Sequence, residues 1–198
     1  MGEDASPTAA AFYFDLASPL AYLAAEQVLQ LLPGPAEWRG VLAGELPGAG
    51  VKPAAGYGED YRALVAERAG ELALQPLRWP EEFPFDSRLA MLIATYARSI
   101  GRAVPFAQAA FRQAFAGGRS LAEEDSVLIA AAACEMHPSA VLRAAGMRSV
   151  SEQLAAATAQ AGEAGVREVP AVTVGELVFH GEGTLRQAAE AMLEAGAG

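Results

Sequence analysis

Residues 12–22, near the start of the chain, read FYFDLASPLAY, an aromatic and apolar run that meets a serine and a proline. The apolar run predicts a buried β-strand over residues 12–16, and the alanine- and leucine-rich stretch from Pro19 to residue 32 predicts a helix. Ser18 is expected as the N-cap of that helix, with Pro19 at its first position. A right-handed β-α-β crossover places such a joint at the carboxyl end of the strand, where open α/β sheets bind ligands.

A second pattern stands near the other end of the chain, where residues 169–179 read VPAVTVGELVF. It predicts a strand begun by Pro170, a tight turn at Gly175 and Glu176, and a second strand. A further strand is expected over residues 37–42. Helices are expected over residues 59–70, 86–101, 105–117, 123–136, 138–145, 150–165 and 184–195. The sequence therefore predicts an α/β fold whose β-α-β and β-β-α halves are separated by a large all-helical insertion.

The helical stretch contains no internal repeat and no charged linker, which favours an insertion over two tandem domains. We expect a discontinuous α/β domain over residues 11–56 and 166–198, and an inserted helical subdomain over residues 57–165. Residues 1–10 are small, polar or acidic and are expected to form a flexible tail.

The chain of 198 residues carries 24 acidic and 14 basic side chains, which gives a formal net charge of -10. Lys52 is its only lysine, and nucleic acid is not expected as a partner, because phosphate contacts need clustered cations. The first residues lack the cationic and apolar regions of a signal peptide, and no apolar run is long enough to cross a bilayer. The sequence therefore predicts a cytoplasmic protein without a membrane partner.

Cys134 is the only cysteine, so neither an intramolecular disulfide nor a Cys-x-x-Cys redox pair can form. It follows a run of small and apolar residues, 127–133, that predicts a buried helix, where a cysteine behaves as a small apolar side chain. A reactive thiol is the less favoured alternative, because nothing beside Cys134 in sequence would lower its pKa. No metal centre is expected, since the two histidines are far apart in sequence.

Two interpretations of Ser18 follow from its neighbours alone. In the first, Ser18 only caps the helix. In the second, its hydroxyl and the free amides at the start of the helix also bind an anion, such as a thiolate or an oxyanion. A hydrolytic serine is disfavoured, because no base lies in its segment and Asp15 is expected too close to the strand backbone to orient His137 or His180.

Pro170 stands at the start of a predicted strand, where its missing amide is tolerated. The sequence leaves open whether the bond between Val169 and Pro170 is cis or trans. In the cis form, the backbone of Val169 faces outward and can pair with an extended ligand, as an added strand close to Ser18.

Four segments together resemble the thioredoxin-like DsbA superfamily, and within it the branch of 2-hydroxychromene-2-carboxylate isomerases and kappa-class glutathione transferases. They are residues 12–22 at the first strand and helix, 37–42 (EWRGVL) at the second strand, 83–91 (FPFDSRLAM) in the insertion, and 165–170 (GVREVP) at the approach to the family's cis-proline. The resemblance covers nearly everything from residue 12 to residue 192. It implies a thioredoxin-like fold with a large all-helical insertion.

The resemblance also implies a chemistry. Redox-active relatives begin the first helix with Cys-Pro-x-Cys, whereas residues 18–21 here read SPLA, so dithiol exchange is unavailable. In the isomerase and transferase branch, the serine is thought to stabilise the thiolate of bound glutathione. By resemblance, Ser18 is the catalytic residue, and glutathione binds at Ser18, Val169, Pro170, Gly183 and Thr184.

Gly183 and Thr184 depart from the family pattern, because relatives commonly carry Asp and Arg there to hold the glutamyl end of glutathione. Loss of one charge-assisted contact costs about 1.5–3 kcal/mol, or about ten- to a hundred-fold in binding. Another low-molecular-weight thiol is therefore the alternative cofactor.

The expected substrate is a small aromatic or conjugated carboxylate, and the candidate residues for binding it are Lys52, Tyr57, Asp86 and Arg88. Lys52 and Arg88 offer cations for the carboxylate, although a solvated surface charge is the favoured interpretation of both. Asp86 stands where the family commonly has asparagine, and it would repel an anion. A homodimer is expected by analogy with relatives.

The first hypothesis is a glutathione-dependent isomerase of the 2-hydroxychromene-2-carboxylate isomerase type, or a kappa-like glutathione transferase. The alternative is a redox-inactive DsbA-family protein that binds a peptide or small ligand beside Pro170.

Overall fold

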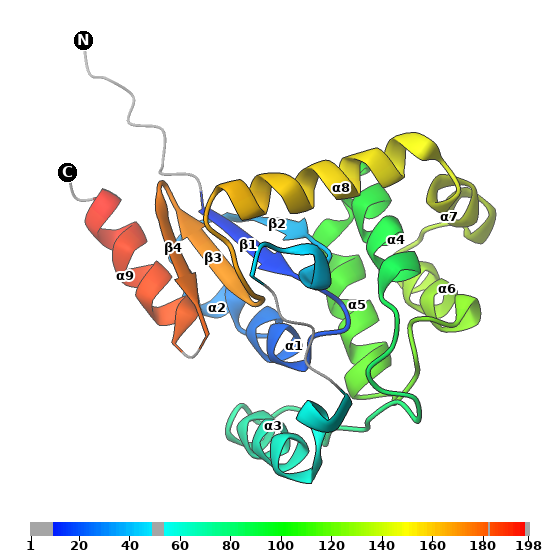
Figure 1. Cartoon of the computed structure of the whole chain (residues 1–198), viewed down its shortest axis with the longest axis horizontal. Coiled ribbons are helices and arrows are strands. Elements are labelled where there is room, and N and C mark those ends of the chain that lie inside the picture. The colour runs from blue at the N-terminus through cyan, green and yellow to red at the C-terminus, as the bar shows by residue number, and fades with distance from the viewer. Residues whose placement is uncertain (1–9, 49–53, 182, 197–198) are drawn as a thin grey trace.

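The structure is a computed structural model, and it describes residues 10–48, 54–181 and 183–196. Within these residues, four strands form one mixed sheet in the order β2-β1-β3-β4 (Figure 1). β1 (Ala10–Phe14) is parallel to β2 (Ala36–Gly40) and antiparallel to β3 (Ala171–Val174), and β4 (Leu177–His180) is antiparallel to β3. The sheet is therefore assembled from the two ends of the chain, which confirms the predicted β-α-β and β-β-α halves.

β1 lies at the centre of the sheet, and all its residues are buried because both faces are covered. It begins at Ala10, so the expected tail boundary at residue 10 is wrong; residues 1–9 lie outside the described residues. It ends at Phe14 and not at residue 16. The reason is that the next side chain, Asp15, accepts hydrogen bonds from backbone amides outside the strand ladder.

Helices make up most of the chain between β2 and β3. The sequence predicts one helix after β1, but the structure has α1 (Pro19–Ala25) and α2 (Val28–Leu31), because the chain turns at Glu26 and Gln27. The other elements are the short 3-10 turns η1 (Ala43–Glu45) and η2 (Ala54–Tyr57), and the helices α3 (Glu59–Glu71), α4 (Arg88–Ser99), α5 (Ala103–Phe115), α6 (Glu124–Ala132), α7 (Pro138–Ala145), α8 (Arg148–Glu163) and α9 (Thr184–Gly196).

The alternation of side chains along β1 divides the core between the two faces of the sheet. Phe12 and Phe14 point to one face, where they pack in a large apolar cluster with residues of α1, α4, α5 and α9. Ala11 and Tyr13 point to the other face, which α8 crosses (Figure 1), and pack there with Ala161. The sheet is thus covered on both sides.

Aromatic side chains join the helical insertion to the sheet. Phe111 on α5 is fully buried, and its ring centroid lies 5.8 Å from that of Phe14 and 6.1 Å from that of Tyr22. Phe115, one turn further along α5, stacks on Tyr22 at 5.7 Å. The helical block and the α/β part therefore share one continuous cluster of buried residues.

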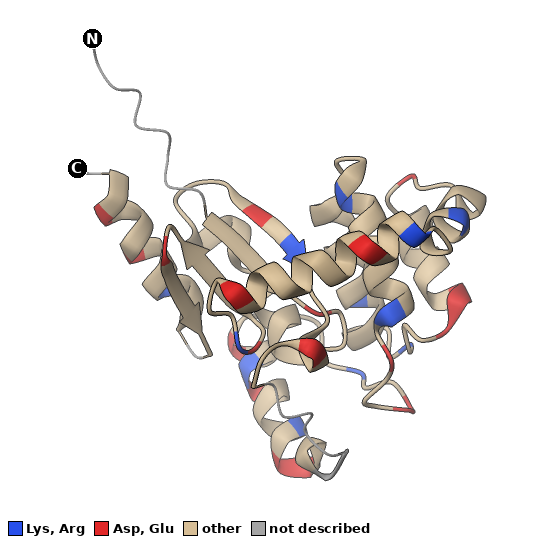
Figure 2. Ribbon diagram, turned by 45° about the horizontal axis from the view of Figure 1, so that its top comes forward, with Lys and Arg blue, Asp and Glu red and all other residues tan. Residues whose placement is uncertain are grey.

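Charged residues of both signs are scattered over the outer helices (Figure 2). Several arginines are paired with acids: Arg112 on α5 makes two hydrogen bonds to Glu26 at the end of α1, at 2.7 and 2.6 Å, and Arg98 on α4 pairs with Glu37 on β2. The pair of Arg98 and Glu37 lies at the surface, where an ion pair contributes little to stability. In the other pair the Glu26 side chain is only 10% exposed.

Cys134 is buried next to the end of α6, and burial raises the pKa of its thiol, which keeps it protonated. Among the described residues, no helix has the length and apolar character that a bilayer crossing requires.

Candidate active site

Ser18 lies at the joint between β1 and α1. Its amide donates to the carbonyl of Asp15 over 2.9 Å, which closes a tight turn. Its Oγ accepts a hydrogen bond of 3.1 Å from the amide of Ala21, and Pro19 occupies the first helical position, as predicted. A hydroxyl has one hydrogen to donate, and no acceptor among the described residues engages that of Ser18. The capping serine therefore keeps a hydrogen-bond donor for a ligand.

Ser18 lines a cavity of about 610 Å³ between α1, the loop after β2, and the start of α4. The predicted residues Tyr57, Asp86 and Arg88 line the same cavity, together with Val169. Sequence segments far apart therefore meet around Ser18. Lys52, the fourth substrate candidate, lies outside the described residues.

A second cavity, of about 330 Å³, adjoins the first and shares Leu20, Glu168 and Val169 with it. Its lining contains the other predicted residues: Pro170, Gly183 and Thr184. The bond between Val169 and Pro170 is cis. The predicted site residues that the structure describes thus fall on two connected cavities, one on each side of Val169.

Arg167, in the segment before Pro170, is held by hydrogen bonds of both its backbone and its side chain. The amide of Arg167 donates to Nε2 of His180 on β4 over 3.1 Å, and its guanidinium donates to the carbonyl of Gly162 on α8 over 2.6 Å. Val169 is therefore positioned by contacts to α8 and β4 and not by a flexible loop.

The smaller cavity carries charges of both signs at its rim. Arg68 and Glu71 come from α3, Arg186 comes from α9, and Glu168 precedes the cis-proline. Gly183 and Thr184 contribute no charge, in agreement with the departure seen in the sequence. A zwitterionic ligand end would find both an anionic and a cationic partner here.

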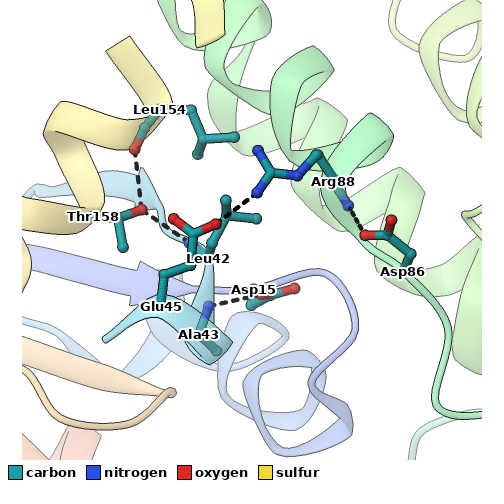
Figure 3. Close-up of polar contacts among 8 residues, drawn as sticks. All are labelled: Asp15, Leu42, Ala43, Glu45, Asp86, Arg88, Leu154 and Thr158. Atoms are coloured by element: carbon teal, nitrogen blue, oxygen red, sulfur yellow. Dashed lines mark hydrogen bonds and ion pairs between the residues drawn. The ribbon is translucent and has the colours of Figure 1, made fainter. Parts of the chain in front are cut away.

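Arg88, at the start of α4, already has an ion-pair partner in the larger cavity. Its guanidinium forms an ion pair of 2.6 Å with Glu45 on η1, and both side chains are about half-exposed (Figure 3). Its backbone amide donates to the Asp86 carboxylate over 2.9 Å, which explains why α4 begins two residues later than predicted. A carboxylate ligand would reach Arg88 only by competing with Glu45.

Thr158 on α8 fixes the loop that carries Glu45. Its hydroxyl donates to the carbonyl of Leu154 over 3.0 Å and accepts from the amide of Leu42 over 3.0 Å, and the side chain is 3% exposed (Figure 3). The next amide, that of Ala43, donates to Asp15 over 2.9 Å. The last helix of the insertion thus holds one wall of the cavity.

Aromatic rings form another part of the wall. Tyr57, Tyr61 and Phe85 line the larger cavity, with Tyr57 and Tyr61 in edge contact at 5.3 Å. Burial raises the pKa of Tyr61 to about 12, and burial followed by the charge of Asp15 raises that of Tyr57. Both phenols therefore stay protonated near neutral pH. This wall suits a planar, apolar ligand.

Asp15 is the site residue that sequence reasoning missed. It lines the larger cavity and is only 5% exposed. Its Oδ1 accepts from the amide of Ala17 and its Oδ2 from that of Ala43, both over 2.9 Å, and the hydroxyl of Ser87 bonds it as well. Burial nevertheless raises the pKa of Asp15 above its ordinary value, and the negative charge of Asp86 adds to this.

This raised pKa predicts a pH-dependent stability. The folded state binds the Asp15 proton more tightly than the unfolded state does, so this contribution to stability is present at low pH and is lost as pH rises through the raised pKa. Urea unfolding at a series of pH values is expected to show that the difference between wild type and Asp15→Asn changes in this direction. A difference that is the same at every pH would contradict the prediction, and Asp125→Asn, an exposed aspartate on α6, serves as the control.

The sheet order, the serine-capped helix after β1 and the helical insertion define a thioredoxin-like protein. The model of the DSBA-like thioredoxin domain family matches residues 10–193, and the chain belongs to that family. No match to the chain is found among the curated proteins.

Solved structures show the same fold. A 2-hydroxychromene-2-carboxylate isomerase has a TM-score of 0.81 and 21% sequence identity, over 93% of this chain and 94% of the other. A probable DsbA oxidoreductase from Streptomyces coelicolor has a TM-score of 0.78 and 17% identity, over 95% and 89% of the two chains. The cytosolic disulfide reductase DsbM from Pseudomonas aeruginosa, solved with GSH, has a TM-score of 0.69 and 14% identity, over 96% and 98%. At these identities the likeness establishes the fold alone.

Proposed function

We propose that this protein is a glutathione-dependent isomerase of the 2-hydroxychromene-2-carboxylate isomerase type, acting on a small aromatic or conjugated carboxylate. The main supporting observation is the available hydroxyl of Ser18 in a cavity that continues past Val169 into a second, charged cavity. Disulfide exchange is disfavoured, because Cys134 is the only cysteine and it is buried away from both cavity linings.

The residues present fit glutathione. Ser18 offers a donor for the sulfur, and Val169 lies where the two cavities meet, beside the extended peptide backbone of such a ligand. Glu71 and Arg186 at the smaller cavity offer partners for its ammonium and carboxylate groups. These side chains would take the role of the Asp and Arg that relatives carry at the positions of Gly183 and Thr184.

When bound, glutathione supplies a nucleophilic sulfur for reversible addition to a conjugated carbonyl compound. Ser18 donates a hydrogen bond that stabilises negative charge on that sulfur. Arg88 exchanges Glu45 for the substrate carboxylate, and the rings of Tyr57, Tyr61 and Phe85 pack against the substrate's planar part. The cavity keeps the reacting groups together and limits the access of water.

Calorimetric titration of the purified protein with glutathione and with S-methyl glutathione tests this proposal. We expect glutathione to bind the more tightly of the two, by about tenfold or more, because the methylated sulfur cannot form a thiolate and loses a charge-assisted hydrogen bond. Equal affinity for the two compounds, or no binding of either, contradicts a glutathione thiolate site.

Equal binding would instead favour the second candidate, a redox-inactive protein that binds a peptide or small ligand along Val169 and Pro170. The continuous lining of the smaller cavity by both residues supports this candidate. A kappa-like transferase differs from the isomerase in one respect: the sulfur stays attached to the product, which mass spectrometry of the product detects.

A further inference from the structure

We infer that the Asp15 carboxylate accepts the proton of the thiol that binds beside Ser18, so that the sulfur is held as a thiolate. This inference rests on the proposed function. The S–H bond of the thiol breaks, its electron pair stays on sulfur, and the proton forms an O–H bond on Asp15. Ser18 then donates its own hydroxyl hydrogen to the thiolate, and no co-reactant is needed.

Asp15 and Ser18 lie close together at the larger cavity. Asp15 lies in the same tight turn as Ser18, whose amide bonds the Asp15 carbonyl over 2.9 Å, and both residues line the larger cavity. A thiol bound against Ser18 therefore shares one cavity with the Asp15 carboxyl group. Asp15 is only 5% exposed, so bulk water has little direct access to its carboxylate.

The hydrogen bonds of Asp15 leave room for one more. An ionised carboxylate has about four lone-pair sites. The described donors are the amides of Ala17 and Ala43 and the hydroxyl of Ser87, which together use three of them. The remaining site can take a proton while these donors stay in place.

Two other acidic groups around the cavity, Glu45 and Asp86, are less suited than Asp15 to accept the thiol proton. Glu45 is in an ion pair with Arg88, and Asp86 accepts the Arg88 amide; these groups are exposed. The charge of Asp86, two residues before α4, acts on Asp15, and the charge of Asp15 acts in turn on the phenol of Tyr57 on η2. Arg167 and Glu168 line the wall before β3. Burial and the charge of Asp86 both favour the protonated form of Asp15, in agreement with its raised pKa.

The test measures thiolate and proton release together. Glutathione is titrated near neutral pH while the ultraviolet absorbance of the thiolate is recorded, and calorimetry in two buffers of different ionisation enthalpy gives the protons released. We expect wild-type protein to form thiolate with almost no proton release, because Asp15 retains the proton. Thiolate formed with release of about one proton per site, or binding without thiolate, overturns the inference.

Two variants sharpen the test. Asp15→Asn is expected to lose the thiolate signal or to release about one proton with it, whereas Asp125→Asn behaves as wild type. Ser87→Ala removes a donor to the carboxylate and is expected to increase the ratio of thiolate to thiol by about tenfold, because the charged form of Asp15 becomes less favourable. A merely structural role of Asp15 would not produce that increase.

Ser87→Ala still tests the inference if Asp15→Asn fails to fold. Ser87 stands at the N-cap of α4, but its side chain makes no capping hydrogen bond, so its removal leaves the helix intact. Ser99→Ala, at the far end of the same helix, is the matched control. An unchanged thiolate ratio in Ser87→Ala counts against the inference.

A second thiol distinguishes a wrong proposed function from a wrong assignment of the proton acceptor. If glutathione does not bind, the proposed cofactor is wrong, and the same measurements are made with 2-mercaptoethanol, which needs no contact in the smaller cavity. Thiolate formation without proton release then still supports Asp15 as the acceptor. If neither glutathione nor 2-mercaptoethanol forms a thiolate in the cavity, the assignment of Asp15 as proton acceptor is wrong.

Discussion

Replacement of Phe111 by alanine is expected to lower the free energy of unfolding by about 3–5 kcal/mol, the usual cost of removing a buried phenylalanine ring. Phe111 is fully buried on α5 and contacts the rings of both Phe14 and Tyr22. Because the apolar cluster runs without interruption from the sheet into the insertion, we expect the whole protein to unfold in one transition.

The two tryptophans allow the unfolding of the α/β part and of the helical insertion to be measured separately. Trp38 lies on β2, and Trp79 lies in the segment between α3 and α4. Single-tryptophan variants, Trp38→Phe and Trp79→Phe, report on the two parts separately during urea unfolding. We expect Phe111→Ala to shift both signals to the same lower midpoint. A shift confined to Trp79 would mean that the helical insertion, residues 57–165, unfolds on its own.

Ser18→Ala is expected to weaken glutathione binding by about ten- to a hundred-fold, because a hydrogen bond to a charged sulfur contributes about 1.5–3 kcal/mol. The affinity for S-methyl glutathione is expected to stay nearly the same, since that compound carries no thiolate. The loss of the helix cap costs about 1 kcal/mol of stability in addition, so binding is measured well below the unfolding midpoint.

Ser18→Thr is the matched control, because threonine keeps both the cap and the hydroxyl. Thiolate binding that falls equally in Ser18→Ala and Ser18→Thr would point to a steric effect. Equal loss of glutathione and S-methyl glutathione affinity in Ser18→Ala would mean that Ser18 shapes the cavity without acting on the sulfur.

Local patterns in the sequence were sufficient for the framework of the fold. Residues adjacent in sequence are enough to predict the strand, serine and proline of residues 12–22 and the hairpin around Gly175. α7 has the bounds that Pro138 predicts. Helix ends were less predictable. α5 begins at Ala103, two residues before Pro105, since proline is tolerated anywhere in a first turn, where amides have no helical partner.

The parts of the site that depend on long-range contacts could not be predicted. Asp15 follows a strand directly, which suggests only a backbone cap; its role at the cavity appears once the loop after β2 and the start of α4 surround it. Likewise, the pairing of Arg88 with Glu45 and the hydrogen bond of Thr158 to Leu42 each join residues distant in sequence. Such contacts carry no periodicity that a sequence pattern can reveal.

The central place of β1 has a consequence for how the protein is made. β1 has a partner on each side, and these partners leave the ribosome at very different times: β2 follows within the first βαβ unit, whereas β3 begins only at Ala171. Until then, one edge of β1 exposes unpaired amides and carbonyls, and the space beside Ser18 lacks the wall formed by Val169. The nascent chain therefore carries an open strand edge until β3 has been translated, and the wall that Val169 adds beside Ser18 forms only after the whole helical insertion has been made.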